Sequence, residues 1–142
     1  MLPALPPNLS RPMSDTVVST LSTLTTFTAA DGENLAVQDW PLLEGTSRGT
    51  VLLVHGLGEH VGRYDAVARR LNAWGFAVRG YDQYGHGESG GPRGGLTGEM
   101  RLLDDLADIV DATRARMAPG QPLVLLGHSM GGLVAARFVS MH

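Results

Sequence analysis

Short apolar runs alternate with amphipathic segments along this chain, and the alternation predicts its secondary structure. Residues 23–29 are rich in β-branched side chains, and residues 35–40 return after the Asp31-Gly32 turn as the second strand of a hairpin. Residues 50–54 form a continuous apolar run, which is typical of a strand buried on both faces of a parallel sheet. Residues 77–81 and the apolar run 122–126 are predicted as the next two strands.

Helical periodicity separates these strands. One predicted helix carries apolar side chains on one face and polar ones on the other, namely Tyr64, Val67, Ala68, Leu71 and Trp74 against Arg69, Arg70 and Asn72. A longer one has an apolar face made of Leu102, Leu103, Leu106, Ile109, Val110 and Met117. Its acids come early (Asp104, Asp105 and Asp108) and its arginines late (Arg114 and Arg116), which matches the helix dipole and indicates a solvated face.

Residues 132–138 predict a final helix, so the elements run hairpin, strand, helix, strand, helix, strand, helix. Such an order predicts an α/β fold with a parallel sheet and helices on both of its faces. At 142 residues the chain allows one domain. Four of its eight prolines lie within residues 1–12, so we expect residues 1–22 to be a disordered leader, with Met13 as an alternative start.

Composition narrows the classes of function. The net charge of −3 gives no electrostatic reason to expect a nucleic-acid partner. Cysteine is absent, which excludes disulfides and thiolate metal sites and fits a reducing compartment, so we expect a cytoplasmic location. No apolar stretch reaches the roughly 18 residues that would indicate a transmembrane span.

The pentapeptide Gly127-His128-Ser129-Met130-Gly131 follows the last predicted strand and precedes the last predicted helix. In this context a G-x-S-x-G sequence forms a sharp turn that holds the serine in a strained conformation, with its oxygen above the amino end of a helix. Ordinary βα turns also contain Gly and Ser, but the flanking strand and helix favour Ser129 as a nucleophile.

A glycine-containing loop after the first buried strand is expected to supply an oxyanion donor that acts with Ser129. Its sequence is His55-Gly56-Leu57-Gly58-Glu59-His60. In a serine hydrolase of this layout one oxyanion donor lies in this loop and the other is the N–H after the nucleophile. The expected donors are therefore the backbone N–H groups of Leu57 and Met130. Without the serine motif the same loop would be interpreted as a plain glycine turn.

Two other chemistries deserve comparison. Gly56, Gly58 and Gly62 resemble a dinucleotide-binding turn, with Asp82 as an acid for a ribose, but their spacing departs by one residue from G-x-G-x-x-G. A metal site is also disfavoured, because His55, Glu59 and His60 lie in a glycine-containing loop and not on the helix of an H-E-x-x-H motif. In residues 82–89, we expect His86 and Ser89 to hold the loop by hydrogen bonds.

Taken in order, the chain resembles the α/β-hydrolase fold, and within it the monoacylglycerol lipase and lysophospholipase-type esterases. The motifs that carry the resemblance are 55–60 with Arg63-Tyr64, residues 82–89, and residues 127–132. The resemblance implies Ser129 as nucleophile, Leu57 and Met130 as oxyanion donors, a small lipid-ester substrate and no cofactor. It implies that residues 23–142 are the amino-terminal part of such a domain.

One departure from the family concerns the remaining triad residues. In this fold the acid and the histidine follow the serine, yet after Ser129 the chain has no Asp or Glu and its one histidine is His142. We therefore expect a domain cut off after the nucleophile helix, which aggregates or folds poorly alone and shows negligible esterase activity. Alternatives are another serine hydrolase or acyltransferase on this fold (peptidase or thioesterase), a dinucleotide-binding domain, and a non-catalytic fragment.

Overall fold

The computed structural model describes residues 22–43 and 45–142, so the expected leader lies outside the described residues except for Ser22. Five strands form one mixed sheet in the order β1-β2-β4-β3-β5. The strands are β1 (Thr23–Thr28), β2 (Asn34–Trp40), β3 (Thr50–Val54), β4 (Ala77–Tyr81) and β5 (Leu123–Gly127). Every strand that the hydrophobic pattern predicts is present, which confirms the α/β class.

The direction of the strands divides the sheet into two parts. β1 and β2 form the predicted antiparallel hairpin, and β2 also pairs antiparallel with β4. β3 lies between β4 and β5 and is parallel to both. The carboxyl ends of these three parallel strands therefore meet at one edge, which is where an open α/β sheet places its ligands.

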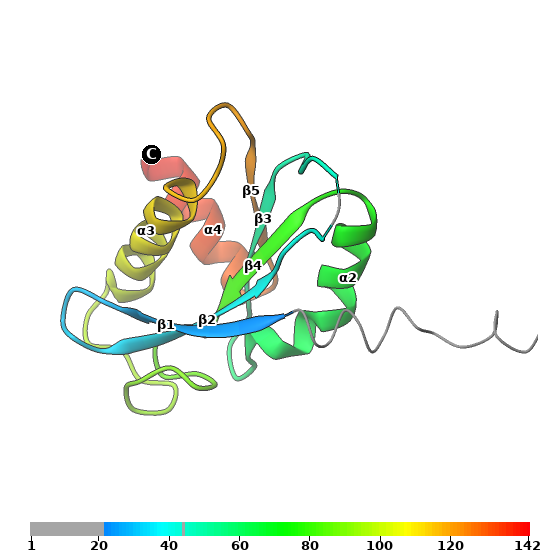
Figure 1. The fold of residues 1–142 in the computed structure, drawn as a ribbon. Coiled ribbons are helices and arrows are strands. Elements are labelled where there is room, and N and C mark those ends of the chain that lie inside the picture. The colour runs from blue at the N-terminus through cyan, green and yellow to red at the C-terminus, as the bar shows by residue number, and fades with distance from the viewer. Residues whose placement is uncertain (1–21, 44) are drawn as a thin grey trace, which may run out of the picture.

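Helices cover both faces of the sheet, as predicted. They are α2 (Asp65–Ala73), which follows the 3₁₀ helix η2 (Val61–Tyr64), then α3 (Arg101–Arg114) and α4 (Met130–Met141). Figure 1 shows α3 and α4 on one side of the sheet and α2 on the other. Alternate residues of β3 face the two layers, with Leu52 and Val54 packed toward α3 and α4 and Val51 and Leu53 toward α2. Within the described residues, no helix combines the length and apolar character that a bilayer crossing requires.

The inward face of α2 differs from the prediction. Ala68 is buried and Leu71 packs against the core, but Val67 and Trp74 are 41% and 57% exposed. Asn72, expected on the polar side, donates hydrogen bonds to the carbonyls of Trp40 and Phe76 at 3.0 and 2.8 Å. The spacing of apolar residues alone predicted the wrong inward face for α2. An asparagine whose amide donates to two backbone carbonyls can face the domain as a leucine does, because its polar atoms have partners.

The solvated acidic face expected on α3 is also only partly correct. Asp104 is exposed, but Asp105 is 4% exposed and accepts a hydrogen bond from Arg101 Nε at 2.8 Å. Arg101 additionally pairs with Asp31 of the hairpin turn and lies over the ring of Tyr84. The buried pair Arg101–Asp105 lies within α3, and the contacts of Arg101 with Asp31 and Tyr84 fix the first turn of α3 against the rest of the domain, a role that residue spacing does not reveal. Met117 lies beyond the end of α3.

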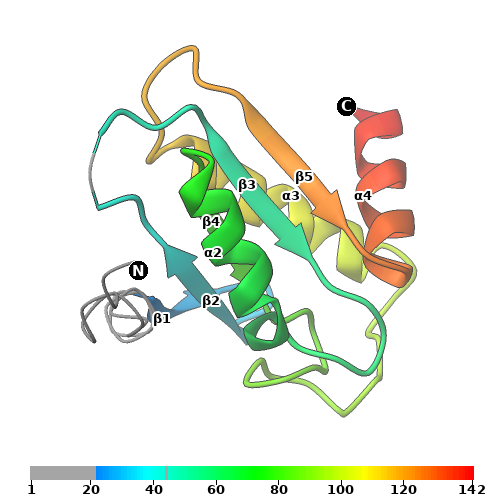
Figure 2. The ribbon, with the colours of Figure 1, turned by 90° about the vertical axis from the view of Figure 1, so that its right-hand side faces the viewer.

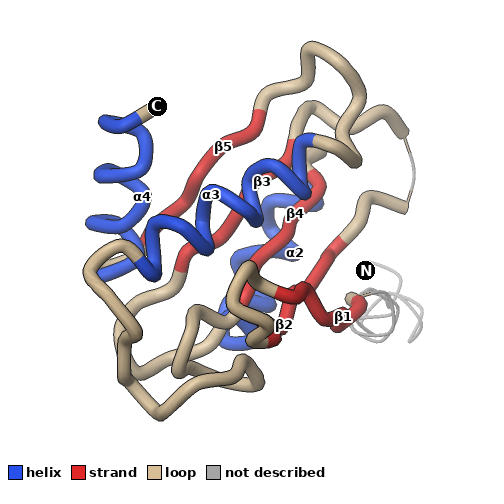
Figure 3. Tube along the Cα trace, turned by 90° about the vertical axis from the view of Figure 1, so that its left-hand side faces the viewer, coloured by secondary structure: helices blue, strands red, loops and turns tan. Residues whose placement is uncertain are grey.

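β5 pairs only with β3 within the described sheet, and one of its faces is uncovered. Leu125 packs against the core beneath α3 and α4, whereas Val124 and Leu126 point to the other face and are 45% and 41% exposed. In Figure 2 α2 lies in front of β4 and β3 and leaves β5 bare, while Figure 3 shows the opposite face covered by α3 and α4. An exposed apolar edge strand of this kind promotes association between chains.

Two lysine substitutions on neighbouring residues of β5 test this picture. We expect Val124→Lys to reduce aggregation of the 142-residue chain and to change its unfolding free energy by less than about 1 kcal/mol. We expect Leu125→Lys to cost about 3 kcal/mol or more, because it buries an unpaired charge. Size-exclusion chromatography with light scattering and urea unfolding would measure the two effects. Equal loss of stability in both variants would contradict the assignment of the two faces.

Candidate active site

Ser129 stands at a sharp turn between β5 and α4. Its backbone angles are φ 54° and ψ −120°, and it is the one non-glycine residue in the described part of the chain with positive φ. An L-residue rarely adopts this conformation, which costs of the order of 1–3 kcal/mol and persists only where the surroundings impose it. The predicted strained turn is therefore present, with the serine at the amino end of a helix of 12 residues.

The two flanking glycines of the motif are required by close backbone contacts. A Cβ atom on Gly131 would overlap the carbonyl oxygens of Val54 and His55 at the end of β3. A Cβ atom on Gly127 would lie 2.5 Å from the carbonyl oxygen of Gly131. Gly132 has no such restriction, since the nearest atom to its added Cβ would be 3.5 Å away. The motif thus depends on two glycines that let the first turn of α4 press against β3.

The glycine loop after β3 lies directly against the serine. A Cβ atom on Gly56 would be 3.3 Å from the carbonyl oxygen of His128 and 3.4 Å from Cβ of Ser129. Leu57, the next residue, is 68% exposed. Within residues 22–43 and 45–142, the N–H groups of Leu57 and Met130 donate no hydrogen bond to the protein. Both expected oxyanion donors therefore have a free N–H group; Met130 directly follows Ser129 in the sequence, and Leu57 follows Gly56, which lies against the serine.

His55 is a structural residue of this edge. The side chain of His55 is fully buried. Its Nε2 atom accepts a hydrogen bond from the Gln83 N–H at 2.9 Å, so the proton of the neutral ring is on Nδ1. Nδ1 donates to the Gly56 carbonyl at 2.7 Å. Burial lowers the pKa of His55, and the imidazole is neutral. The Gln83 side chain also donates to the His55 carbonyl at 2.6 Å. Because both ring nitrogens are used, His55 is not available as a metal ligand.

Asp82 organises the loop after β4. Its carboxylate accepts the N–H groups of Val61 and Glu88 at 2.8 and 2.9 Å, and its side chain is buried. An acid committed to two backbone donors is not free to bind a ribose, which counts against a dinucleotide site. The Ser89 hydroxyl donates to the Asp82 carbonyl and accepts the Ala36 N–H, so Ser89 holds the loop as expected.

His86 lies in the same buried cluster. Its Nδ1 is 3.0 Å from the Tyr84 carbonyl, and its ring is 5.2 Å from the ring of His55, centroid to centroid. Its position agrees with the expectation that it holds the loop. Among the residues that the structure describes, no imidazole is hydrogen-bonded to the Ser129 hydroxyl.

His142 does not approach the serine. It ends α4, stacks on Phe138 and bonds to the Phe138 carbonyl through Nδ1 at 2.9 Å. A helix of 12 residues is roughly 18 Å long, and α4 runs back along β5 so that its last residue lies at the opposite end of the strand from Ser129 (Figure 2). As the sequence indicated, His142 is not placed to act as a general base.

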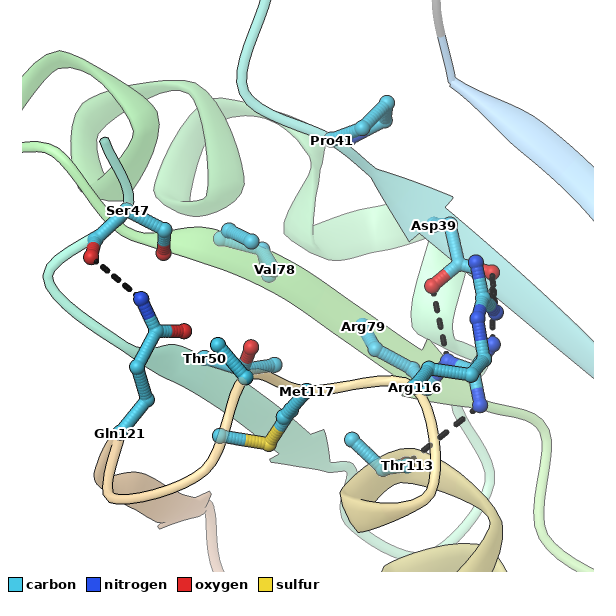
Figure 4. A pocket seen from close by; sticks show the side chains of 12 residues that line it. Asp39, Pro41, Ser47, Thr50, Val78, Arg79, Thr113, Arg116, Met117 and Gln121 are labelled. Atoms are coloured by element: carbon cyan, nitrogen blue, oxygen red, sulfur yellow. Dashed lines mark hydrogen bonds and ion pairs between the residues drawn. The ribbon is translucent and has the colours of Figure 1, made fainter. Parts of the chain in front are cut away.

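A separate cavity of about 210 Å³ lies at the amino ends of β3 and β4, away from Ser129 (Figure 4). Arg79 crosses its wall and forms a two-pronged ion pair with Asp39 at 2.8 and 3.1 Å, and Arg116 lies 3.3 Å from the same carboxylate. Gln121 bridges to the Ser47 carbonyl on its other side. The charged side chains of this cavity pair with one another, which indicates a structural role for them. The candidate active site is therefore the one at the carboxyl ends of the parallel strands.

A strained serine between a strand and a helix, beside a glycine loop with free N–H groups, is the arrangement expected of a hydrolase site on an α/β sheet. Residues 45–142 match the family model described as serine aminopeptidase, S33. The chain therefore belongs to this α/β-hydrolase family, as the resemblance of its three motifs predicted.

Relatives and solved structures agree with that assignment. The chain is 39% identical to the monoglyceride lipase of Homo sapiens over 106 residues, which are 75% of this chain and 34% of the human one. It is 37% identical to the monoacylglycerol lipase of Mycolicibacterium smegmatis, over 82% of this chain and 41% of the relative. A carboxyl esterase from Bacillus coagulans in complex with glycerol superposes with a TM-score of 0.76 at 28% identity, over 85% of this chain and 40% of the esterase. The chain thus spans about a third to two fifths of the length of these proteins.

The glycine contacts predict opposite effects for two adjacent substitutions. We expect Gly131→Ala to lower the unfolding free energy by at least about 2 kcal/mol, because the methyl group collides with the β3 backbone. Gly132→Ala is the matched control and should be neutral or stabilising by up to about 1 kcal/mol, since alanine is the better helix former. Urea unfolding followed by circular dichroism would compare them. A neutral Gly131→Ala would contradict the close packing of α4 on β3.

The neutral state of His55 predicts a dependence of stability on pH. The unfolded histidine binds a proton near its ordinary pKa of 6.5 and the folded one does not, so stability is lost as pH falls through that value. The slope contributed by His55 approaches about 1.4 kcal/mol per pH unit. We expect His55→Gln to remove this slope between pH 7 and pH 5, whereas His60→Gln, which leaves His55 in place, should retain it. An unchanged slope in His55→Gln would show that His55 is not the titrating group.

Proposed function

We propose that Ser129 is the nucleophile, and the N–H groups of Leu57 and Met130 the oxyanion donors, of a serine hydrolase that cleaves carboxylic esters of lipid type. The observation that carries this proposal is the strained backbone of Ser129, held at the amino end of α4 and pressed against Gly56. Strain of this kind is typical of functional sites, and the N–H groups of Leu57 and Met130 donate no hydrogen bond within the described residues, which supports their proposed role.

The reaction follows from this arrangement. Ser129 Oγ attacks the ester carbonyl, and the negative charge that develops on the carbonyl oxygen is stabilised by the N–H groups of Leu57 and Met130 and by the helix dipole. The alcohol then leaves, an acyl group remains on Ser129, and water hydrolyses it. Loss of one such donor typically costs about 3–4 kcal/mol of transition-state stabilisation. No step of this scheme calls for a cofactor.

The substrate class is proposed from the relatives. Two of them are a monoglyceride lipase and a monoacylglycerol lipase, which supports a monoacylglycerol as the substrate of the protein to which these residues belong. A lysophospholipid is the second lipid ester that we propose, from the resemblance of the motifs. The family description names an aminopeptidase, and a thioesterase domain from a curacin pathway superposes with a TM-score of 0.66 at 26% identity. Peptidase and thioesterase activities are therefore the alternatives, because acyl transfer to a serine is common to all three.

Among the described residues, no imidazole is hydrogen-bonded to Ser129, and we propose that these residues supply neither a general base nor its acid. His55 is fully engaged and His142 is remote, while no Asp or Glu follows the serine. A serine hydroxyl without a base is a poor nucleophile at neutral pH, so we expect negligible turnover from these residues by themselves.

The absence of cysteine supports a cytoplasmic location for the protein.

The decisive experiment labels the protein, as its natural host makes it, with a fluorophosphonate and measures its intact mass. We expect the label on Ser129 and hydrolysis of a monoacylglycerol, with Ser129→Ala lowering kcat by about 10⁴-fold or more. A panel of one monoacylglycerol, one lysophospholipid, one acyl thioester and one aminoacyl anilide would distinguish the alternatives.

The possible outcomes separate the hypotheses. Preference for the thioester or the anilide would replace the lipid-ester assignment and retain the nucleophile. A protein of 15.0 kDa that takes up no label would contradict catalysis and favour a non-catalytic role. Stabilisation by NAD(H) without labelling of Ser129 would favour the dinucleotide-binding alternative.

A further inference from the structure

Glu59 forms an unusual junction in the loop that carries Leu57. Its Oε1 atom accepts the backbone N–H of Gly56 at 2.8 Å and the hydroxyl of Tyr64. The first bond closes a turn around Leu57, and the second ties that turn to the end of η2. Gly56, which precedes the expected oxyanion donor Leu57, is therefore held by the side chain of Glu59.

The same oxygen also faces the serine turn. His128 Nδ1 lies 3.7 Å from Glu59 Oε1, and His128 directly precedes Ser129. Gly56 lies so close to the serine that a Cβ atom added to it would be 3.4 Å from Cβ of Ser129. Glu59 consequently touches both loops on which the candidate site is built, from a side chain that is 15% exposed.

Electrostatics keep the carboxyl group ionised. Burial by itself would raise the pKa of Glu59, but the hydrogen bonds from Tyr64 and the Gly56 N–H outweigh it, and the pKa lies below the ordinary 4.5. Conversely, burial and the bond to the carboxylate raise the pKa of Tyr64 to about 12. At neutral pH the junction is a carboxylate with a neutral phenol, which makes both hydrogen bonds charge-assisted.

We propose that Glu59 is a positioning residue, whose carboxylate fixes the Leu57 N–H relative to Ser129 by binding the Gly56 N–H and the Tyr64 hydroxyl at a point next to His128. The inference rests on the proposed function, since it assigns the bond a purpose in oxyanion stabilisation. Oxyanion donors act only when they are preorganised, and a displacement of about 1 Å costs up to roughly 100-fold in rate. A flexible glycine on each side of Leu57 would leave this N–H mobile without such a clamp.

The test uses recombinant protein of the length that the host produces, and four variants. Glu59→Ala removes the acceptor, Glu59→Gln keeps the shape without the charge, and Tyr64→Phe removes one donor. Glu88→Gln is the matched control, an exposed glutamate in the neighbouring loop at the same edge. Two readouts are needed: NMR of the Gly56 amide, and steady-state kinetics with fluorophosphonate labelling.

The NMR readout tests the clamp without reference to catalysis. We expect the Gly56 amide shift to follow the ionisation of Glu59 with a midpoint below 4.5, and Tyr64→Phe to move that midpoint upward. We expect Glu59→Ala to abolish the titration and the slow hydrogen exchange of this amide. A Gly56 amide unaffected by Glu59→Ala would overturn the proposal.

The kinetic readout tests the purpose of the clamp. We expect Glu59→Ala to lower kcat by about 10- to 100-fold with little change in KM, Glu59→Gln to fall between it and the wild type, and Glu88→Gln to match the wild type. An unchanged kcat in Glu59→Ala, with Ser129 still labelled, would overturn the positioning role. Absence of label in the wild type would instead contradict the proposed function, and the NMR result would still decide whether the clamp exists.

Discussion

The close approach of α4 to the end of β3 is the contact on which the candidate site depends. Gly131 lies against the carbonyl oxygens of Val54 and His55, where no side chain fits, and the His128 N–H donates to the Val54 carbonyl at 3.1 Å. These contacts pin both sides of Ser129 to the middle strand of the parallel part of the sheet. The positive φ of Ser129 is the consequence, because the chain must reverse from strand to helix within one residue.

A strained residue stays strained only if its surroundings are rigid, and here buried polar side chains supply the rigidity. His55 and Gln83 cross-link the loops after β3 and β4, and Asp82 binds the amides of two segments. His55 and Asp82 are satisfied by backbone groups, and the Gln83 amide nitrogen donates to a carbonyl while its buried side-chain oxygen has no partner. These bonds offset much of the cost of burying polar atoms and fix the loops. His55, His86 and Asp82 thus hold the loops of this edge, and the proposed chemistry is assigned to a serine and two backbone amides.

Ion pairs hold the periphery of the same domain. Arg79 and Asp39 join β4 to β2 beside the end of α3, and Arg101 joins α3 to the hairpin turn and to Asp105. Asp31 is partly exposed, whereas Arg79, Asp39, Arg101 and Asp105 are largely buried. A buried pair adds little net stability over an apolar replacement, but losing one partner leaves a buried charge, so Arg79 and Asp39 fix how β4 meets β2. The uncovered face of β5 is the contrasting region, since neither an ion pair nor an apolar layer within the described residues protects it.

The sequence by itself determined the elements and the fold class and indicated Ser129 as the candidate nucleophile, because periodicity and the motif around Ser129 are local and depend on a few adjacent residues. The bounds of β3 and β4 coincide with the apolar segments 50–54 and 77–81. Only the tertiary structure decided that Asp105 is buried, that Asn72 faces the interior and that Val67 does not. It alone showed that Glu59 joins the two loops, because that role requires the distance between Gly56, Tyr64 and His128. Polar side chains are placed by partners far away in the sequence, and spacing along the chain carries no record of those partners.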